Sequence, residues 1–460
     1  MLSGLCGDLH NREKCAAKLT ATGKGFIYFL SPTVDILFIL YAFKSVCLDY
    51  VLFCIYLFLG CWLVTRISFF KTSGLGKRLL LILFLLKIIA SIIYGWQGIR
   101  YSYLIQMGDT WRWHFYSLEE LALLKTEPLS FFTDFANNYN NSYSGFFSSY
   151  SWWNDLHTYA FTKLLTVFNL FSNGSYFINT IFYSLLTFYG PVAVFKMMQH
   201  AFPGKKMLQV FCVFLMPSFL YWSSGIHKDG LAFLGMALVI YHCYFSYYRA
   251  SFRLRDALGT LFGLLLLLLY RNYLLIVLLP ALLAWFVAEW RKRKAWLTFL
   301  IAYGIYGVFF FGLPHLSAHL DLPKAVAEKQ KDFLTLKGNS FVPVKKLEPT
   351  LGSFVKNAPY ALKITLLRPF PSDAKHLFSF VAAAENLLFL MLLIAAFLFW
   401  KKEIPVPAFV WFCVFLSLSV LLIVGYTVNF LGAIVRYRSI VLPFLLTPIL
   451  SQANWRGKRI

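Results

Sequence analysis

Long apolar runs alternate with short polar segments along almost the whole chain. Most runs are close to the length of about twenty residues that an α-helix needs to cross the hydrocarbon core of a bilayer. A β-barrel would show shorter segments of alternating hydrophobicity, and such segments do not dominate here. The pattern predicts an all-α polytopic membrane protein with about twelve transmembrane helices. We place the crossings at residues 26–46, 50–65, 79–97, 175–195, 207–222, 229–247, 256–270, 273–290, 296–313, 376–399, 406–426 and 434–451.

These crossings divide one integrated membrane domain into five consecutive parts. The parts are an N-terminal cytoplasmic tail with three transmembrane helices, a first long outer loop with juxtamembrane helices, the central transmembrane helices, a second long outer loop, and the C-terminal transmembrane helices. Their boundaries are residues 1–97, 98–174, 175–313, 314–375 and 376–460.

Both long loops carry segments with helical spacing. In the first loop, residues 118–125 and 152–171 are amphipathic, so we expect them to lie along the membrane interface as helices. In the second loop, residues 324–336 have a polar helical pattern. Prolines 343, 349 and 359 follow and favour compact irregular structure over one long helix.

Charge sets the expected orientation. The net charge is +23, but only 14% of the residues are charged, and most lysines and arginines sit in short clusters between apolar runs. This distribution is typical of a membrane protein oriented by its cytoplasmic loops and argues against a nucleic-acid partner. It predicts that both termini are cytoplasmic and that both long loops face the opposite side. The clusters lie within residues 12–24, 66–78, 196–206, 249–255, 291–294, 401–402 and 456–459.

The stretch Gln106–Phe115 is the first candidate for chemistry. Asp109, Arg112 and His114 lie within six positions, next to tryptophans that suit a membrane interface. Asp109 is a candidate general base, or a ligand for a divalent metal such as Mg²⁺ or Mn²⁺, with Arg112 and His114 in support. The alternative is a solvated aspartate or one that caps the following helix.

A second candidate lies between two apolar runs, at Gly225–Gly230. It contains His227, Lys228 and Asp229, and ionisable residues at such a break are costly to keep. Lys228 is suited to bind a phosphate, while Asp229 is expected to pair with it or to cap the next helix. A short turn with solvated side chains remains the alternative.

Four arginines form a third group because they end apolar runs on the side that the positive-inside rule disfavours. Guanidinium groups match the oxygens of phosphate or pyrophosphate, so the group predicts an anionic ligand, with snorkelling as the alternative for any single member. The four are Arg271, Arg368, Arg436 and Arg438.

Glu385 lies well inside an apolar run and is unlikely to face lipid. We expect it to hold helices together by pairing with Lys87 or an arginine. The eight cysteines form no CxxC pair, which favours packing roles over a metal site or disulfide. The sequence also has no Walker loop, HExxH or GxSxG motif.

Several of these features together resemble the GT-C superfamily of membrane glycosyltransferases. They are Gly108-Asp109 after an early crossing, a long first outer loop with interface helices, and Arg436-Tyr437-Arg438 near a late crossing. Residues 217–229, 368–371 and 384–386 are also similar to membrane proteins of bacterial polysaccharide-assembly clusters. In the superfamily the Gly-Asp loop follows the first crossing, whereas here it follows the third expected one.

This resemblance implies a polyprenyl-phosphate-linked sugar donor and a catalytic or metal-binding role for Asp109. We therefore expect a glycosyltransferase of the bacterial inner membrane that serves a glycan, lipid-linked or protein acceptor on the periplasmic side. One alternative is a repeat-unit polymerase of the O-antigen type, which needs the arginines but no acidic base. A transporter of lipid-linked oligosaccharide and a structural scaffold are further alternatives. The enzyme hypothesis requires Asp109 and the arginines to share one cavity.

Overall fold

The computed structural model describes residues 32–101, 109–133, 152–291, 294–317, 320–336, 338, 340–400 and 406–455. These parts are built from helices and contain two isolated β-bridges, Phe341–Phe430 and Trp400–Ala453, but no strand. Met1–Ile55 and Tyr56–Ile460 are separate units, and the site described below lies entirely in the second.

The described residues form a series of helices. In chain order they are α2 (Pro32–Arg66), α3 (Ser68–Lys71), α4 (Lys77–Tyr101), α5 (Asp109–Thr126), α6 (Pro128–Thr133), α7 (Trp152–Ser172), α8 (Tyr176–Ala201), α9 (Lys206–Val210), the π-helix η2 (Phe211–Leu215), α10 (Pro217–Ser224), α11 (Lys228–Tyr248), α12 (Leu254–Tyr270), α13 (Asn272–Arg291), α14 (Ala295–Leu316), α15 (Leu322–Thr335), α16 (Leu351–Leu367), the 3₁₀ helix η4 (Pro371–Asp373), α17 (Leu377–Leu398), α18 (Ala408–Thr427), α19 (Leu431–Ser439) and α20 (Leu442–Gln452).

The protein is a multi-pass membrane protein, because its described residues include eight helices long and apolar enough to cross a bilayer. Two bent helix pairs raise this number to as many as ten. The eight spans are Leu48–Arg66, Lys77–Arg100, Tyr176–Ala201, Lys228–Tyr248, Asn272–Arg291, Ala295–Leu316, Leu377–Leu398 and Ala408–Thr427. The all-α class is therefore confirmed, while the count of twelve remains a prediction.

Two expected crossings are broken rather than straight. Residues 207–222 form a pair bent by 51°, and the break falls at Met216 just before Pro217. Residues 434–451 belong to α19 and α20, which meet at 60° next to Pro443. Proline lacks the backbone N–H that would continue the preceding helix, so each break coincides with a proline at the start of the next one.

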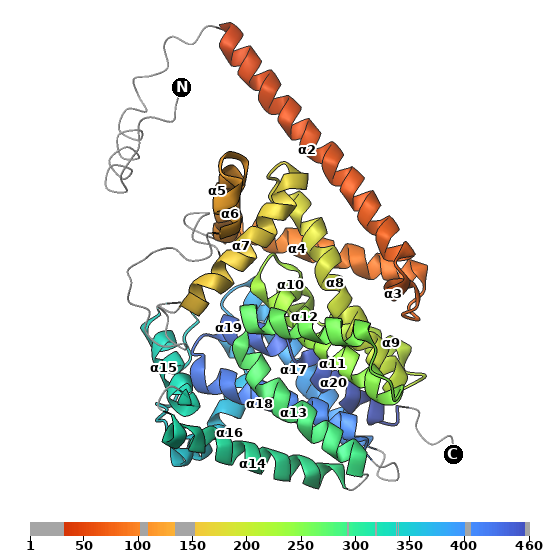
Figure 1. The fold of residues 1–460 in the computed structure, drawn as a ribbon, viewed down its shortest axis with the longest axis vertical. Coiled ribbons are helices and arrows are strands. Elements are labelled where there is room, and N and C mark those ends of the chain that lie inside the picture. The colour runs from red at the N-terminus through yellow and green to blue at the C-terminus, as the bar shows by residue number, and fades with distance from the viewer. Residues whose placement is uncertain are drawn as a thin grey trace. The chain divides into compact units, whose positions relative to one another are not determined.

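α11 is largely buried within the second unit, and α12 packs along it as a hairpin whose outer face is exposed (Figure 1). Gly235 and Gly263 face each other so closely that a Cβ on either would lie within 2.8 Å of the other's carbonyl oxygen. At one end of the hairpin Arg249 pairs with Asp256, and at the other Arg271 pairs with Asp229. The 17-residue α12 therefore runs back along α11 and returns the chain to the level of Asp229.

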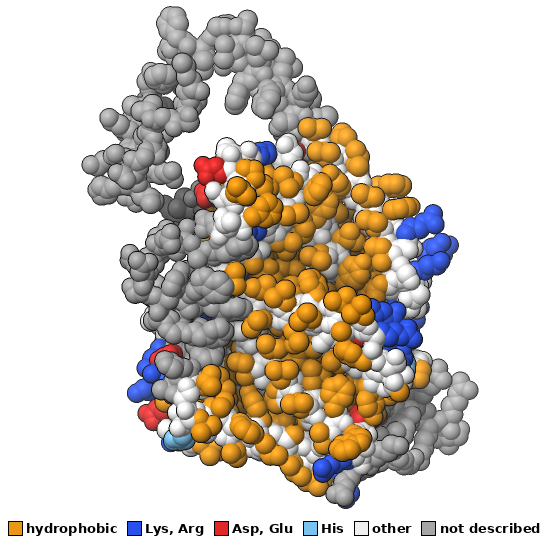
Figure 2. Space-filling model, viewed as in Figure 1, with side chains coloured by type: hydrophobic (Ala, Val, Ile, Leu, Met, Phe, Trp, Pro, Cys, Tyr) orange, Lys and Arg blue, Asp and Glu red, His pale blue; other side chains and the backbone are white. Residues whose placement is uncertain are grey.

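The two ends of the helices differ in charge. The basic connections after α8, α11 and α13 lie at the ends opposite to Lys228, where α11 begins. Figure 2 shows Lys and Arg side chains along the edge where α3 and α9 lie, beside a broad apolar face. An apolar band with charge at its edges is the surface expected of a membrane-embedded protein.

In their described residues the two long loops contain the expected helices and, in addition, α6, α16 and the 3₁₀ helix η4. Residues 118–125 and 152–171 lie within α5 and α7, and 324–336 correspond closely to α15. The irregular structure expected around Pro359 is wrong, because α16 continues through this residue. Ala361 and Tyr426 belong to one buried apolar cluster that links α16 with α18, and this tertiary packing outweighs the local cost of proline.

Candidate functional site

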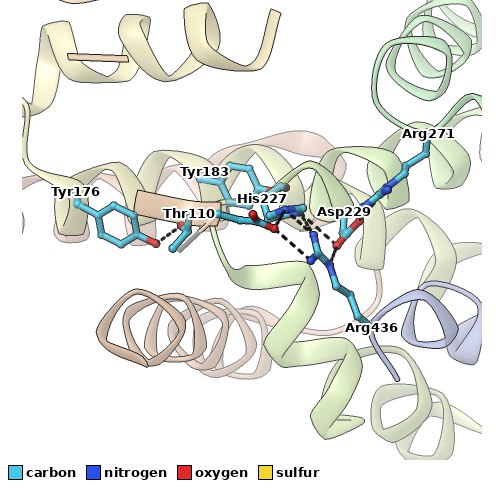
Figure 3. Close-up of polar contacts among 8 residues, drawn as sticks. Thr110, Tyr176, Tyr183, His227, Asp229, Arg271 and Arg436 are labelled. Carbon is cyan, nitrogen blue, oxygen red and sulfur yellow. Dashed lines mark hydrogen bonds and ion pairs between the residues drawn. The ribbon is translucent and has the colours of Figure 1, made fainter. Parts of the chain in front are cut away.

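Asp109, His227, Asp229, Arg271 and Arg436 form one connected cluster (Figure 3). They come from the start of α5, the start of α11, the α12–α13 junction and the last turn of α19. The sequence separation is large: Asp229 and Arg436 are 207 residues apart. The structure thus brings the first two candidate segments together with two of the four arginines.

Asp229 is the buried anion at the centre of this cluster, with only 2% of its side chain exposed. Its Oδ1 accepts bonds from Arg271 Nε at 3.0 Å and Nη2 at 2.6 Å. Its Oδ2 accepts from Arg436 Nε and lies 3.3 Å from His227 Nδ1. The expected pairing of Asp229 with Lys228 is absent from the ion pairs of the described residues, because the arginines occupy both carboxylate oxygens.

Asp109 is the exposed anion of the same cluster, with 51% of its side chain accessible. Its Oδ2 lies 3.4 Å from His227 Nε2 and 3.6 Å from Arg436 Nη1. The hydrogen bond with His227 and the nearby charges of Arg436 and Arg112 hold the pKa of the Asp109 carboxyl well below its usual range. This carboxylate is therefore ionised throughout the physiological range.

Lys228 is a buried amine beside this cluster. The residue is 7% exposed, and its Nζ lies 4.2 Å from the centre of the Trp113 ring. Among the ion pairs of the described part of the chain, none joins Lys228 to a carboxylate. Aromatic rings also cover the arginines: Arg436 lies 5.2 Å from the centre of Trp222, and Arg271 lies 4.9 Å from that of Tyr437.

The α10–α11 connection holds its shape by close packing against its neighbours. Gly225 lies against the Tyr94 ring, and a Cβ there would come within 2.4 Å of ring carbons. A Cβ on Gly230 would lie 2.7 Å from Ser223 O. The hydroxyl of Tyr183 donates to the carbonyl of His227. These contacts require glycine at both ends of the connection and fix the backbone that carries Lys228.

α5 is held by a buried polar face that places Asp109 over the cluster. Its buried residues Thr110, His114, Ser117 and Leu121 recur at helical spacing. The hydroxyls of Thr110 and Tyr176 are 2.6 Å apart, and Asn169 Nδ2 donates to Ser117 Oγ at 2.7 Å. Burial lowers the pKa of His114 to about 4, so its imidazole is neutral and packs within the helix interface.

Arg368, Arg438 and Glu385 lie outside the ion-pair cluster. Arg368 pairs with Asp373 at 3.6 Å. Arg438 is 2% exposed and donates to the carbonyls of Thr365 and Arg368 and to Asn386 Oδ1 at 2.9, 2.8 and 2.6 Å. Such contacts bind α19 to the end of α16. The phosphate-binding role expected for these two arginines remains a prediction.

Glu385 holds two helices together as expected, but its partner is neither Lys87 nor an arginine among the ion pairs of the described residues. Glu385 accepts bonds from the backbone N–H and hydroxyl of Ser218, both at 2.6 Å. Ser218 lies in the first turn of α10, where unsatisfied N–H groups favour a carboxylate. Lys87 Nζ instead donates to Ser223 O at 2.8 Å, near the other end of α10. Glu385 and Lys87 therefore each bind backbone groups at one end of α10, and the sequence alone does not indicate these contacts.

The residues around Asp109 do not fit a divalent metal. No group of three His, Cys, Asp or Glu side chains gathers for one among the residues that the structure describes. The neighbours of the Asp109 carboxylate include His227, Arg436 and the charge of Arg112, and Asp229 already binds Arg271 and Arg436. A metal ion there would face cations rather than oxygen ligands.

The cluster contains the guanidinium groups of Arg271 and Arg436 next to the carboxylates of Asp109 and Asp229, and the amine of Lys228 lies beside it. Guanidinium and amine donors gathered in one place suit an anionic ligand. No family model, curated protein or solved structure matches the chain.

Proposed function

We propose that the chain is a membrane glycosyltransferase of polysaccharide or cell-envelope biosynthesis. It transfers a sugar from a polyprenyl-phosphate-linked donor to a glycan, lipid or protein acceptor. The observation that carries this proposal is the contact of a half-exposed carboxylate, Asp109, with the guanidinium of Arg436 at the end of a membrane helix. A carboxylate and cations in one site supply the base and the phosphate contacts that such a transfer needs.

In the proposed reaction the acceptor hydroxyl attacks the anomeric carbon of the donor sugar. Asp109 takes the hydroxyl proton, the new glycosidic C–O bond forms, and the bond between the anomeric carbon and the phosphate oxygen breaks. The leaving polyprenyl phosphate gains a negative charge. Lys228 and Arg436 stabilise that charge where it develops, while Arg271 holds Asp229 and hence Arg436 in place.

The proposed setting is the inner membrane of a bacterium, with the cluster on the periplasmic side. Its basis is the distribution of lysine and arginine, which favours the cytoplasmic side for the short basic loops and both termini. A lipid-linked donor keeps its prenyl chain in the bilayer and presents its phosphate at the interface. The cluster lies where spans such as Lys228–Tyr248 begin, which matches that depth.

A transfer assay tests this proposal. Purified protein is reconstituted into liposomes with synthetic polyprenyl-phosphate sugars and a lipid extract of the source membranes as acceptor, and released polyprenyl phosphate is quantified. We expect release by the wild type and at least a hundredfold slower release by Asp109→Asn. Glu119→Gln is the matched control, because Glu119 is an exposed acid on the same helix. Equal rates for wild type and Asp109→Asn would exclude Asp109 as the base.

A repeat-unit polymerase is the second candidate, and the engagement of Asp109 with His227 and Arg436 favours it. A carboxylate with a lowered pKa is a weak base, whereas the cations remain suited to a lipid pyrophosphate. Arg436→Lys and Asp109→Asn distinguish the two functions. A polymerase depends more on Arg436, and a transferase with a carboxylate base is disabled by either substitution.

A further inference from the structure

The contact between Asp109 and Arg436 raises a question for the proposed reaction. The same guanidinium cannot bind the donor phosphate through Nη1 while that nitrogen pairs with Asp109. The same carboxylate is also a poor base while it is bound by Arg436 and His227. Both residues can act only if the contact between them is exchanged for another.

The two carboxylates of the cluster differ in how readily they can be exchanged. Asp229 is 2% exposed and has both oxygens bound, so it is a fixed part of the site. Asp109 is 51% exposed and uses one oxygen, at 3.4 and 3.6 Å, without a hydrogen bond to Arg436 of normal length. His227 and Arg436 are 6% and 13% exposed, so water reaches this contact only from the Asp109 side, whereas it hardly reaches the pairs of Asp229. Asp109 is the carboxylate that an incoming anion displaces.

The cations that Asp109 leaves behind form a phosphate subsite. Arg436 is oriented by its Nε bond to Asp229, so its Nη1 stays directed toward the position of Asp109. Lys228, which lies between His227 and Asp229 in the chain, packs against the Trp113 ring of α5 and has no carboxylate partner among the ion pairs of the described residues. A phosphodiester carries one negative charge, as Asp109 does, so the exchange leaves the charge of the site unchanged.

We infer that Asp109 occupies the subsite of the donor phosphate in the free protein and is released as a base only when that phosphate binds. This inference rests on the proposed function and adds a regulation to it: the base becomes active only with the donor in place. The anion recognised is a lipid-linked phosphate, and its prenyl chain is held by the bilayer rather than by Asp109. No covalent step is added to the transfer itself.

Binding measurements test this exchange without turnover. Wild type, Asp109→Asn and Glu119→Gln are placed in lipid nanodiscs and titrated with polyprenyl phosphate, with the uncharged polyprenol as reference. Removing the competing carboxylate is expected to tighten phosphate binding by about fivefold, the equivalent of one exposed ion pair. Glu119→Gln should bind like the wild type, and polyprenol affinity should not change. Asp109→Ser replaces Asp109→Asn if the latter does not fold.

The outcomes separate the inference from the proposed function. Tighter phosphate binding by Asp109→Asn, together with slower sugar transfer, supports the exchange, because loss of a simple contact residue would weaken both. If the wild type prefers the phosphate over the alcohol and Asp109→Asn binds it no more tightly, the exchange is overturned and the transferase proposal stands. If neither protein distinguishes phosphate from alcohol, both are overturned.

Discussion

We expect replacement of Lys87 by methionine to change the geometry of the site while it leaves the stability of the fold nearly unchanged. Lys87 lies in α4, is 3% exposed and donates to Ser223 O at 2.8 Å, with Ser224 Oγ at 3.5 Å. The carbonyl groups at the end of α10 have no partner within the helix, so the ammonium satisfies them and fixes where α10 stops. His227 follows three residues after Ser224.

The expected change in stability is small because two terms offset each other. Loss of a hydrogen bond from a charged donor costs about 1.5–3 kcal/mol. A lysine at the centre of a membrane helix costs about 2.5–3.5 kcal/mol to keep there, and methionine removes that cost. The free energy of unfolding should therefore change by about 1 kcal/mol or less. The position of His227–Asp229 should change, since α10 loses its anchor on α4.

The site is far more sensitive to this shift than the fold. Misplacement of a binding group by about one ångström can reduce rates by about a hundredfold. We expect Lys87→Met to weaken polyprenyl phosphate binding by about tenfold or more at nearly unchanged Tm, and Lys87→Arg to recover part of the affinity. Titration in nanodiscs and thermal unfolding of the same preparations measure both quantities.

Lys196→Met is the matched control for this experiment. Lys196 lies in α8 near the opposite end of the helices, where its Nζ is 3.2 Å from Thr72 Oγ1 and 4.5 Å from the centre of the Phe69 ring. We expect this substitution to leave phosphate affinity unchanged. Full affinity in Lys87→Met would refute the reasoning, as would a loss of affinity that only accompanies a comparable fall in Tm.

Three further predictions concern the packing around the site. Gly230→Ala should unfold at lower temperature and lose phosphate binding, because its Cβ would lie 2.4 Å from the Tyr183 hydroxyl and 2.7 Å from Ser223 O; thermal unfolding and titration check this. Burial lowers the pKa of His114 from 6.5 to about 4. Between these pH values the unfolded chain binds a proton at His114 and the folded protein does not, so the free energy of unfolding falls as the pH falls, by up to about 3 kcal/mol. In His114→Gln the dependence of Tm on pH between these values should become shallower, and an unchanged slope would contradict the assignment. Arg438→Met should reduce stability by about 3 kcal/mol or more, because three buried oxygen atoms lose their donor; an unchanged Tm in detergent would argue against that role.

Some parts of the site could be predicted from the sequence because their signal is local. The apolar run that begins after Asp229 marks a membrane helix, and an ionisable residue at its start marks a candidate site whatever else the chain does. Gly225 and Gly230 were compatible with either interpretation of this segment, and only the structure shows that both meet close neighbours. Helices in the outer loops were recognisable from the 3.6-residue period of their apolar positions.

The partners of these residues were decided only by the tertiary structure. Lys228 and Asp229 are adjacent in sequence, yet Asp229 binds arginines 42 and 207 residues away. Glu385 accepts hydrogen bonds from Ser218 and does not pair with Lys87. The donors nearest to it are unpaired N–H groups at the start of α10, which are available only when α10 has formed beside α17. The apolar runs of the sequence are enough to predict each membrane helix, and the residues that flank a run show which of its ends carries charge. The pairing of these charges depends on how helices distant in the sequence pack against each other. In a low-dielectric interior such contacts decide whether a carboxylate is fixed or exchangeable. Asp229 is fixed, and we infer that Asp109 is exchangeable.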